Sequence, residues 1–248
     1  MNKIDQGLLD TWNLYGNYVS YAIAAVGLLI LVGHLFKLMI TKDHKEKYDY
    51  INMYEINLLW YSALLIIIAL AVYANTLVAE SGMMWFFVRL FVSTMFAIIA
   101  GVIVQNILKF YYPFYIEKRL KLLRFSPRIS PEGRKMKLLS EEEEDVYLDE
   151  GMQAEEDAFS VDYDVWIDEE SGYTKIEKYN GRLHALKCNE CNYQTLRVNK
   201  EEVVRSATAD EDGELVKSFT CGYCGHKEKK SYTIARLKAP TEEAGSGS

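Results

Sequence analysis

The sequence predicts a membrane α-helical protein, with three transmembrane helices followed by a small cytoplasmic zinc-ribbon β domain. Three observations support this fold class. The first half of the 248-residue chain contains three apolar segments that are each long enough to cross a bilayer. The second half, from Lys118 onward, is heavily charged, and its last quarter holds all four cysteines as two Cys-x-x-Cys pairs. The net charge of −7 comes from this second half and gives no support for general nucleic-acid binding.

The predicted transmembrane domain extends over residues 18–125. Its apolar segments run about from Tyr18 to Ile40, from Ile56 to Val78 and from Met84 to Leu108, and a span needs roughly 20 apolar residues. The first segment is too long for a cleaved signal peptide, and its N-terminal flank carries two aspartates beside a single lysine. One apolar run alone is compatible with a buried helix of a soluble protein, but three in succession favour membrane helices.

Lysine and arginine indicate how these helices are oriented. The first loop carries three lysines, the second loop (residues 79–83) carries no base, and many bases follow the third apolar segment. Because basic flanks stay in the cytoplasm, residues 1–17 are expected outside the membrane and the C-terminal half inside.

Few polar side chains lie within the predicted spans. No Asp, Glu or Lys lies near the middle of any span, which weakens a proton-conducting role. Arg89 is expected to reach outward to Glu80 or to lipid headgroups, although a functional role stays open. His34 can ligate haem or relay a proton, but no span holds a second histidine, so packing or hydrogen bonding is favoured. Small residues on the third span permit close helix contacts within the chain or with a partner: Ser93, Thr94, Ala97, Ala100 and Gly101.

The third helix is predicted to continue past the membrane. Residues 114–125 form a basic amphipathic segment with Ile116, Leu120 and Leu123 on one side, and Pro113 can kink it. Such a segment suits the surface of an anionic inner leaflet. Ordinary basic flanking of a transmembrane helix is the alternative.

A linker and an acidic segment are predicted next. Residues 126–139 include two of the four prolines and a glycine, which indicates a linker. Residues 140–174 then form an acidic segment, with 15 acids and no base between Glu141 and Glu170. This run is either a solvated surface, a partner for the preceding bases of the same chain, or a docking site for a basic partner. It lacks the ligand order of a calcium-binding EF-hand loop.

A helix is predicted at the start of the acidic segment. Ser140 and Glu143 have the spacing of a capping box, which begins a helix. Leu148, Met152 and Phe159 would give that helix a narrow apolar stripe.

The strongest chemical signal lies in residues 175–238, the predicted zinc ribbon. Cys188-Asn-Glu-Cys191 and Cys221-Gly-Tyr-Cys224 each present two thiolates on a tight turn, and four thiolates complete a tetrahedral Zn²⁺ shell. Alternating, strand-like stretches lie between the pairs and after them. The prediction is therefore a structural Zn²⁺ held by Cys188, Cys191, Cys221 and Cys224, with no open position for catalysis. A redox dithiol is the alternative for one pair but does not explain two.

The residues around the two cysteine pairs leave several roles open. His226 is expected to be a surface residue and not a fifth ligand. Tyr193 and Tyr223 either close the small core or anchor a protein partner. Bases flank both pairs, but acids lie between them and oppose contact with phosphate. Residues 239–248 are predicted to be a tail, whose last four residues look like an added linker.

Part of the second half resembles a known family. The run from Leu139 to Gly151, with sequence LSEEEEDVYLDEG, the run SVDYDVW from Ser160 to Trp166, and the two cysteine pairs resemble the cytoplasmic cysteine-rich tails of some bacterial TPM-domain membrane proteins. The resemblance covers about residues 135–237. It implies a tail beneath a bacterial inner membrane. Further cysteine pairs flank the acidic segment in that family but not here, and the TPM domain itself is absent, so that domain's activity is not implied.

These features favour a non-enzymatic accessory or scaffold subunit of a bacterial inner-membrane complex. Its partners would be the lipid bilayer and other membrane subunits, and the zinc ribbon and acidic segment are expected to bind a cytoplasmic protein, not nucleic acid or lipid. The alternative is a subunit of a homo-oligomeric ion channel or transporter, for which lumen-facing polar rows are sparse. A membrane enzyme is disfavoured because the chain lacks paired intramembrane acids, a histidine pair, a Gly-rich phosphate loop and a Gly-x-Ser-x-Gly turn.

Overall fold

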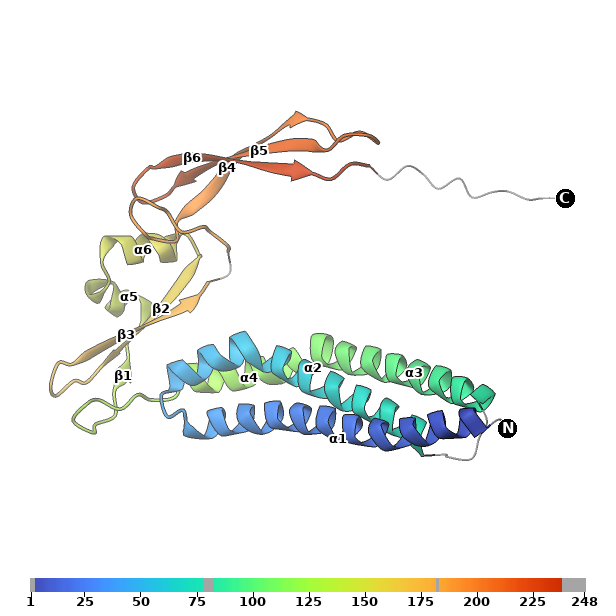
Figure 1. The fold of residues 1–248 in the computed structure, drawn as a ribbon. Helices are drawn as coiled ribbons and strands as arrows, with labels where there is room; N and C mark the ends of the chain where they lie inside the picture. Colours follow the sequence, from blue (N-terminus) through green and yellow to red (C-terminus); the bar gives the residue numbers. More distant parts are fainter. Residues whose placement is uncertain (1–2, 78–82, 182, 238–248) are drawn as a thin grey trace. The chain divides into compact units, whose positions relative to one another are not determined.

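The computed structural model describes residues 3–77, 83–181 and 183–237 (Figure 1). The chain divides into two compact units, Met1–Ser126 and Pro127–Ser248, which we call the helical unit and the β unit. The predicted tail at 239–248 and all of the predicted second loop except Met83 lie outside the described residues.

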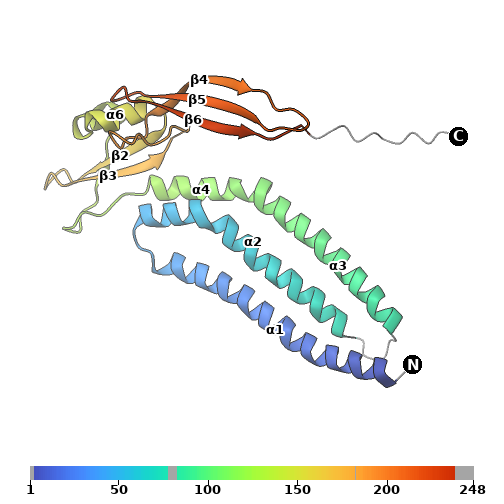
Figure 2. The ribbon, with the colours of Figure 1, turned by 45° about the horizontal axis from the view of Figure 1, so that its top comes forward.

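Long helices make up the helical unit. In chain order its elements are α1 (Lys3–Ile40), α2 (His44–Thr76), α3 (Met83–Asn106), a π-helical turn (Ile107–Tyr111) and α4 (Tyr112–Arg124). α2 lies between α1 and α3 (Figure 2). Three helical stretches are long and apolar enough to cross a membrane, in agreement with the three predicted spans: Gly7–Ile40, His44–Thr76 and Met84–Arg124.

The outer surface of these helices is apolar. Leu29, Phe91 and Phe96 are each about two-thirds exposed. A helix that is apolar all round is stable when protein or lipid surrounds it, so this surface fits a bilayer. α1 and α2 are joined by a short loop, in which the Asp43 side chain accepts a hydrogen bond from the Glu46 N–H (2.9 Å) and caps α2.

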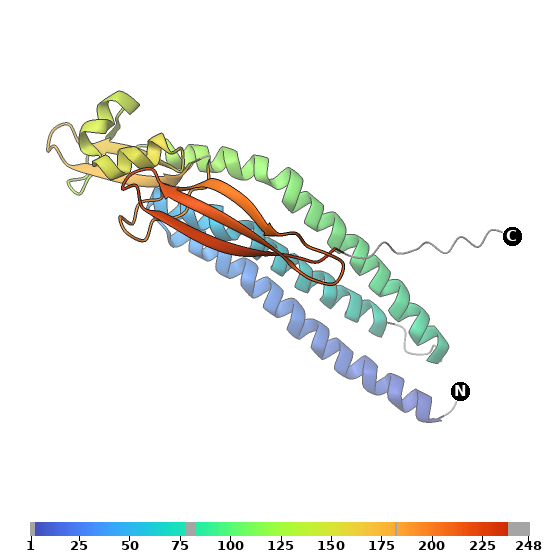
Figure 3. The ribbon, with the colours of Figure 1, turned by 90° about the horizontal axis from the view of Figure 1, so that it is seen from above.

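α3 and α4 form one bent rod, which confirms that the third helix extends beyond a simple span (Figures 2 and 3). The π-helical turn accounts for the bend, and Pro113 lies in the first turn of α4, where its missing N–H is tolerated. Ile116 and Leu120 of α4 are buried against Ile51 of α2. Ile116 and Leu120 of this amphipathic segment are therefore covered by protein, and contact of the segment with a lipid leaflet stays a prediction.

The β unit contains two three-stranded antiparallel sheets, with the strand orders β1-β2-β3 and β4-β5-β6. Its elements are β1 (Lys137–Leu138), α5 (Glu141–Glu144), a 3-10 turn (Asp145–Tyr147), α6 (Glu150–Asp157), β2 (Val161–Ile167), β3 (Thr174–Asn180), β4 (Leu196–Arg205), β5 (Gly213–Cys221) and β6 (Lys227–Ile234). β4, β5 and β6 form at the strand-like stretches of the predicted zinc ribbon, whereas the first sheet was not predicted.

Residues 126–139 are folded, although their prolines and glycine predict a linker. Gly133 has a positive φ of 84°, as expected for a glycine in a turn. After this turn, however, the chain joins the first sheet. Leu138 pairs with Trp166 of β2, and Met136 is buried.

The acidic segment, residues 140–174, does not form one helix. The predicted capping box is present: Ser140 caps α5, and the Glu143 side chain accepts a hydrogen bond from the Ser140 N–H (3.2 Å). α5 nevertheless ends at Glu144, and Asp149 caps a second helix, α6. Frequent Asp residues explain the breaks, because aspartate favours caps and turns over helix interiors.

The predicted apolar stripe is divided between these pieces. Leu148 is buried and Met152 packs beside it, and both lie against Tyr163 and Val165 of β2. Phe159 has a positive φ of 51° and is 62% exposed, so it does not belong to this core. The prediction that the three residues share one helical face is therefore wrong.

Bases on both sides of the acidic segment neutralise many of its carboxylates. Arg134 lies 3.0 Å from Asp168, and Lys178 lies 2.7 Å from the buried Glu155. Lys137 lies 3.1 Å from Glu169 at the surface. One of the roles left open for the acidic segment, ion pairing with bases of the same chain, is therefore present. Docking of a basic partner stays a prediction.

A buried ion pair fastens the start of the β unit to the first sheet. Arg128 Nη2 donates to Glu177 Oε2 (2.6 Å) and to the Tyr179 hydroxyl (3.1 Å). The guanidinium also lies 4.7 Å from the ring centroid of Trp166. Lys175 Nζ lies 2.9 Å from the other oxygen of Glu177. Arg128 and Glu177 are both almost fully buried.

Candidate metal centre

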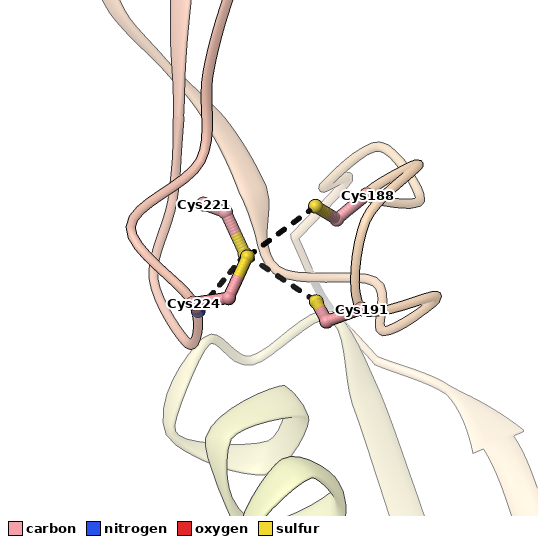
Figure 4. A group of neighbouring side chains, drawn as sticks. All are labelled: Cys188, Cys191, Cys221 and Cys224. Atoms are coloured by element: carbon pink, nitrogen blue, oxygen red, sulfur yellow. Dashed lines mark hydrogen bonds between the residues drawn. The ribbon is translucent and has the colours of Figure 1, made fainter.

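The four cysteines meet at one point of the β unit. Their sulfur atoms lie within 4.8 Å of one another and point toward a common centre (Figure 4). Cys188 Sγ is 3.7 Å from Cys224 Sγ, and Cys191 Sγ is 3.7 Å from Cys221 Sγ. All four are free thiols. Among the described residues, this is the only group of three or more His, Cys, Asp or Glu side chains placed to hold a metal ion.

The two Cys-x-x-Cys turns have the same backbone design. The N–H of the first cysteine, Cys188 or Cys221, donates to the carbonyl five residues later (2.9 and 2.8 Å). The residue after the second cysteine closes each turn with a positive φ, 65° at Asn192 and 72° at Gly225. Asparagine and glycine tolerate this left-handed conformation better than other residues. The sequence itself indicates how both turns close, because asparagine or glycine directly follows each Cys-x-x-Cys pair.

The cysteines differ in burial. Cys188 and Cys221 are buried, Cys191 is half-buried and Cys224 is exposed. β5 ends at Cys221, whereas Cys188 and Cys191 lie on the loop between β3 and β4. Together with Leu196 and Phe219, three of the cysteines, Cys188, Cys191 and Cys221, make up the only core cluster among the described residues of the second sheet.

Hydrogen bonds prepare one cysteine as a thiolate. Burial raises the pKa of the Cys221 thiol, but hydrogen bonds from the Thr195 hydroxyl (3.0 Å) and the Cys224 N–H (3.4 Å) outweigh burial and lower the pKa to about 6. Burial raises the pKa of the Cys191 thiol to about 12. A metal ion reverses that shift, because coordination deprotonates a thiol outright.

Tyr193 connects the first cysteine turn to α6. Its ring lies directly over Gly151, where an added Cβ would approach the ring to 2.1 Å. Its hydroxyl donates to Asp149 (3.1 Å), and its ring meets Tyr223 edge-on, with centroids 5.1 Å apart. Of the two roles left open for these tyrosines, Tyr193 therefore closes a contact within the chain. Tyr223 supports it but remains 41% exposed.

Glu155 extends this connection to the first sheet. Its buried carboxylate accepts hydrogen bonds from the Gln194 N–H, the Tyr163 hydroxyl and Lys178 Nζ. Ser160 Oγ also donates to the Gln194 carbonyl (2.6 Å). The loop that carries Cys188 and Cys191 is thus fixed to both α6 and the first sheet. His226 lies outside the cysteine group and contributes its backbone carbonyl to the second turn.

The helical unit contains a buried polar cluster that the sequence did not reveal. Glu55 accepts hydrogen bonds from the Tyr112 hydroxyl and from Arg119, both at 2.6 Å, and its other oxygen lies 3.6 Å from His34 Nε2. His34 Nδ1 in turn lies 3.1 Å from the Tyr50 hydroxyl. His34 is therefore a hydrogen-bonding residue, as favoured, and Glu55 attaches α4 to α2. Glu55 was overlooked because it directly precedes the predicted second span and its partners are distant in sequence.

Arg89 lies beside a groove of about 460 Å³ between α2 and α3. The groove is otherwise almost entirely apolar and includes Ser93, Ala97 and Ala100, three of the small residues on the third span. Glu80, the predicted partner of Arg89, lies outside the described residues. The structure therefore leaves that predicted pair untested.

Comparison of this chain with known protein families, with characterised proteins and with solved structures finds no match.

Proposed function

We propose that the four cysteines bind one structural Zn²⁺, and that the chain is a non-enzymatic accessory subunit of a bacterial inner-membrane complex. The separation of the sulfur atoms carries the metal assignment. An ion about 2.3 Å from four sulfurs at tetrahedral corners holds neighbouring sulfurs about 3.8 Å apart. Two pairs, Cys188 with Cys224 and Cys191 with Cys221, lie at 3.7 Å and all lie within 4.8 Å, whereas a disulfide brings two sulfurs to about 2.05 Å.

The same geometry supports a structural role for the metal. Four protein ligands fill a tetrahedral shell and leave no position for a substrate or an activated water. The ribbon then serves as a rigid support. The strands that extend from it, together with the exposed Tyr223, present a surface for a cytoplasmic protein.

The helical unit supports the role of an accessory subunit. α3 packs mainly along α2, and both its outer surface and the groove beside α2 remain uncovered within the helical unit. Small residues at this groove allow a neighbouring helix to approach closely. We propose that a helix of another membrane subunit lies there.

Filling this groove should release the partner. Ala100→Phe places a large ring in the groove, so the complex isolated from native membranes is expected to lose a subunit that wild-type protein retains. Ile99→Phe is the matched control, because Ile99 is 52% exposed and does not line the groove, and it should keep the subunit. The measurement is size-exclusion chromatography with mass spectrometry of the purified complex. A pure homo-oligomer from wild-type membranes would instead support the channel or transporter alternative.

The proposed orientation has its own test. A reporter that is active only outside the cytoplasm should be inactive when inserted at Lys42, between α1 and α2, or fused after Leu237. It should be active when inserted at Gly82. This pattern follows from the lysines of the first loop and the bases after the third span. The opposite pattern would place the cysteines in an oxidising compartment and exclude the proposed zinc ribbon.

A further inference from the structure

The register of the second sheet sorts its charges onto two different faces. Residues that are paired across antiparallel strands point to the same face. One face carries five bases and two acids, and we call it the basic face: Arg197, Lys200, Arg205, Lys227 and Lys229, with Glu202 and Glu214. The opposite face carries two bases and two acids: Lys217 and Lys230, with Glu201 and Glu228.

Two β-bulges in β4 add Lys200 to this face. The register shifts between Val198 and Lys200 and again between Val203 and Arg205. Simple alternation would place Lys200 on the face opposite Arg197. The first bulge adds one residue and brings Lys200 to the face of Arg197, and the second adds another and so keeps Arg205 on that face. Bases that look evenly mixed with acids along the sequence are in this way collected on one side.

The basic face is open, whereas the opposite face is covered only where it packs at the metal centre. All five bases are exposed. Between them lie small or hydroxyl-bearing residues of β5 and β6: Val216, Ser218, Thr220, Ser231 and Thr233. The opposite face packs Leu196 and Phe219 into the metal centre, and its lysines are paired, Lys217 with Glu201 (2.7 Å) and Lys230 with Glu228 (2.8 Å).

Few acids compete for the basic face. Lys200 lies 2.9 Å from Glu202, and Arg197 makes a long contact (3.5 Å) to the Asp157 carbonyl at the end of α6. Both contacts lie at exposed positions, where ion pairs contribute little and exchange readily with a competing anion. Five bases against two acids leave this face with an excess of positive charge on a chain whose net charge is −7.

The chemistry of the face fits an extended anionic surface. Proteins that bind single-stranded nucleic acid place aromatic rings among their bases, and the strand positions of the basic face include no aromatic residue, since Phe219 and Tyr232 point to the other side. The β unit begins at Pro127, directly after the helical unit, and so is tethered beside a bilayer. A tether raises the effective concentration of the lipid surface far above that of any dissolved polyanion.

We propose that the basic face docks on an anionic lipid surface. The proposal rests on the membrane anchoring and orientation proposed above, because the cytoplasmic leaflet carries the anionic lipids. Each lysine or arginine near such a surface strengthens binding about fivefold, so the five bases together hold the second sheet against the leaflet. The opposite face of the sheet and the metal centre then remain free for the protein partner.

The test uses full-length, zinc-loaded protein in nanodiscs of phosphatidylcholine, which offer no anionic lipid of their own. Binding is measured to separate vesicles of phosphatidylcholine with or without phosphatidylserine. Lys227→Gln/Lys229→Gln is expected to bind the anionic vesicles about thirtyfold more weakly than wild type. Lys217→Gln/Lys230→Gln is the matched control, because it removes two charges from the opposite face of the same sheet, and it should bind within about twofold of wild type.

The zinc content of both variants establishes that the ribbon remains folded. Equal loss in the two variants, or equal binding to neutral and anionic vesicles, would overturn the proposal. So would a single-stranded oligonucleotide that binds more tightly than the vesicles and depends on Lys227 and Lys229. Lys227→Gln/Lys229→Gln should still retain the co-purifying subunit. The accessory-subunit role is therefore tested independently of lipid docking.

Discussion

Replacing Cys188 and Cys224 together by serine is expected to abolish metal binding and unfold the second sheet. The two sulfurs are 3.7 Å apart and come from different turns, so the variant keeps only one ligand in each turn. The described residues of this sheet bury little besides the cysteines, Leu196 and Phe219. The metal must therefore supply most of the folding free energy, and structural Zn²⁺ contributes about 10–16 kcal/mol in small zinc-finger peptides.

Elemental analysis of the purified protein checks this prediction. Wild-type protein should carry one zinc ion per chain and the double variant none. Limited proteolysis should cut the β4–β5 connection in the variant but leave the helical unit intact. His226→Ala is the control, because His226 lies outside the cysteine group, and it should retain its zinc. Full zinc content in the double variant would disprove the four-cysteine assignment.

Arg128→Leu is expected to destabilise the β unit by about 3–5 kcal/mol, the usual cost of removing one partner from a buried ion pair. Glu177 would remain buried with only Lys175 and Tyr179 beside it. Although burial raises the pKa of Glu177, hydrogen bonds from Arg128 and Lys175 outweigh burial and lower it. In the wild type this stabilisation is therefore present above the ordinary glutamate pKa of about 4.3, and it is lost as the pH falls through the lower folded-state value.

Hydrogen exchange of the β2 and β3 amides measures this effect, because both strands surround the ion pair. Lys137→Gln is the control. It removes the exposed pair with Glu169 and should cost less than about 1 kcal/mol. Arg128→Leu/Glu177→Leu should recover much of the lost stability, since neither charge is then buried alone. Equal protection in wild type and Arg128→Leu would show that the pair does not hold the first sheet together.

Features encoded by short local patterns could be predicted from the sequence. The three apolar runs predict three helices, because span length depends only on residues within about 20 positions. The Cys-x-x-Cys pairs predict a shared centre, because each turn places its own two ligands. The capping box at Ser140 and the turn at Gly133 are local for the same reason.

Features that join distant residues were not predictable in this way. Arg128 and Glu177 are 49 positions apart, and Glu55 and Arg119 are 64 apart, so neither pair leaves a periodic signal. The first sheet did leave a periodic signal in the sequence, because apolar and acidic residues alternate from Val161 to Val165. The density of acids around it concealed this strand. The bulges of β4 leave no signal of their own, which is why the basic face cannot be read from charge counts.

The unequal burial of the four cysteines gives the proposed metal centre a single point of chemical attack. Cys188 and Cys221 are shielded, and Cys191 is partly shielded, whereas Cys224 lies at the surface. Chelators and oxidants therefore reach the sulfur of Cys224 before the others. Oxidation of that sulfur to a sulfenic acid would remove one corner of the tetrahedron while three ligands still retain the ion. We expect the lifetime of the bound metal to depend on how fast this one sulfur dissociates.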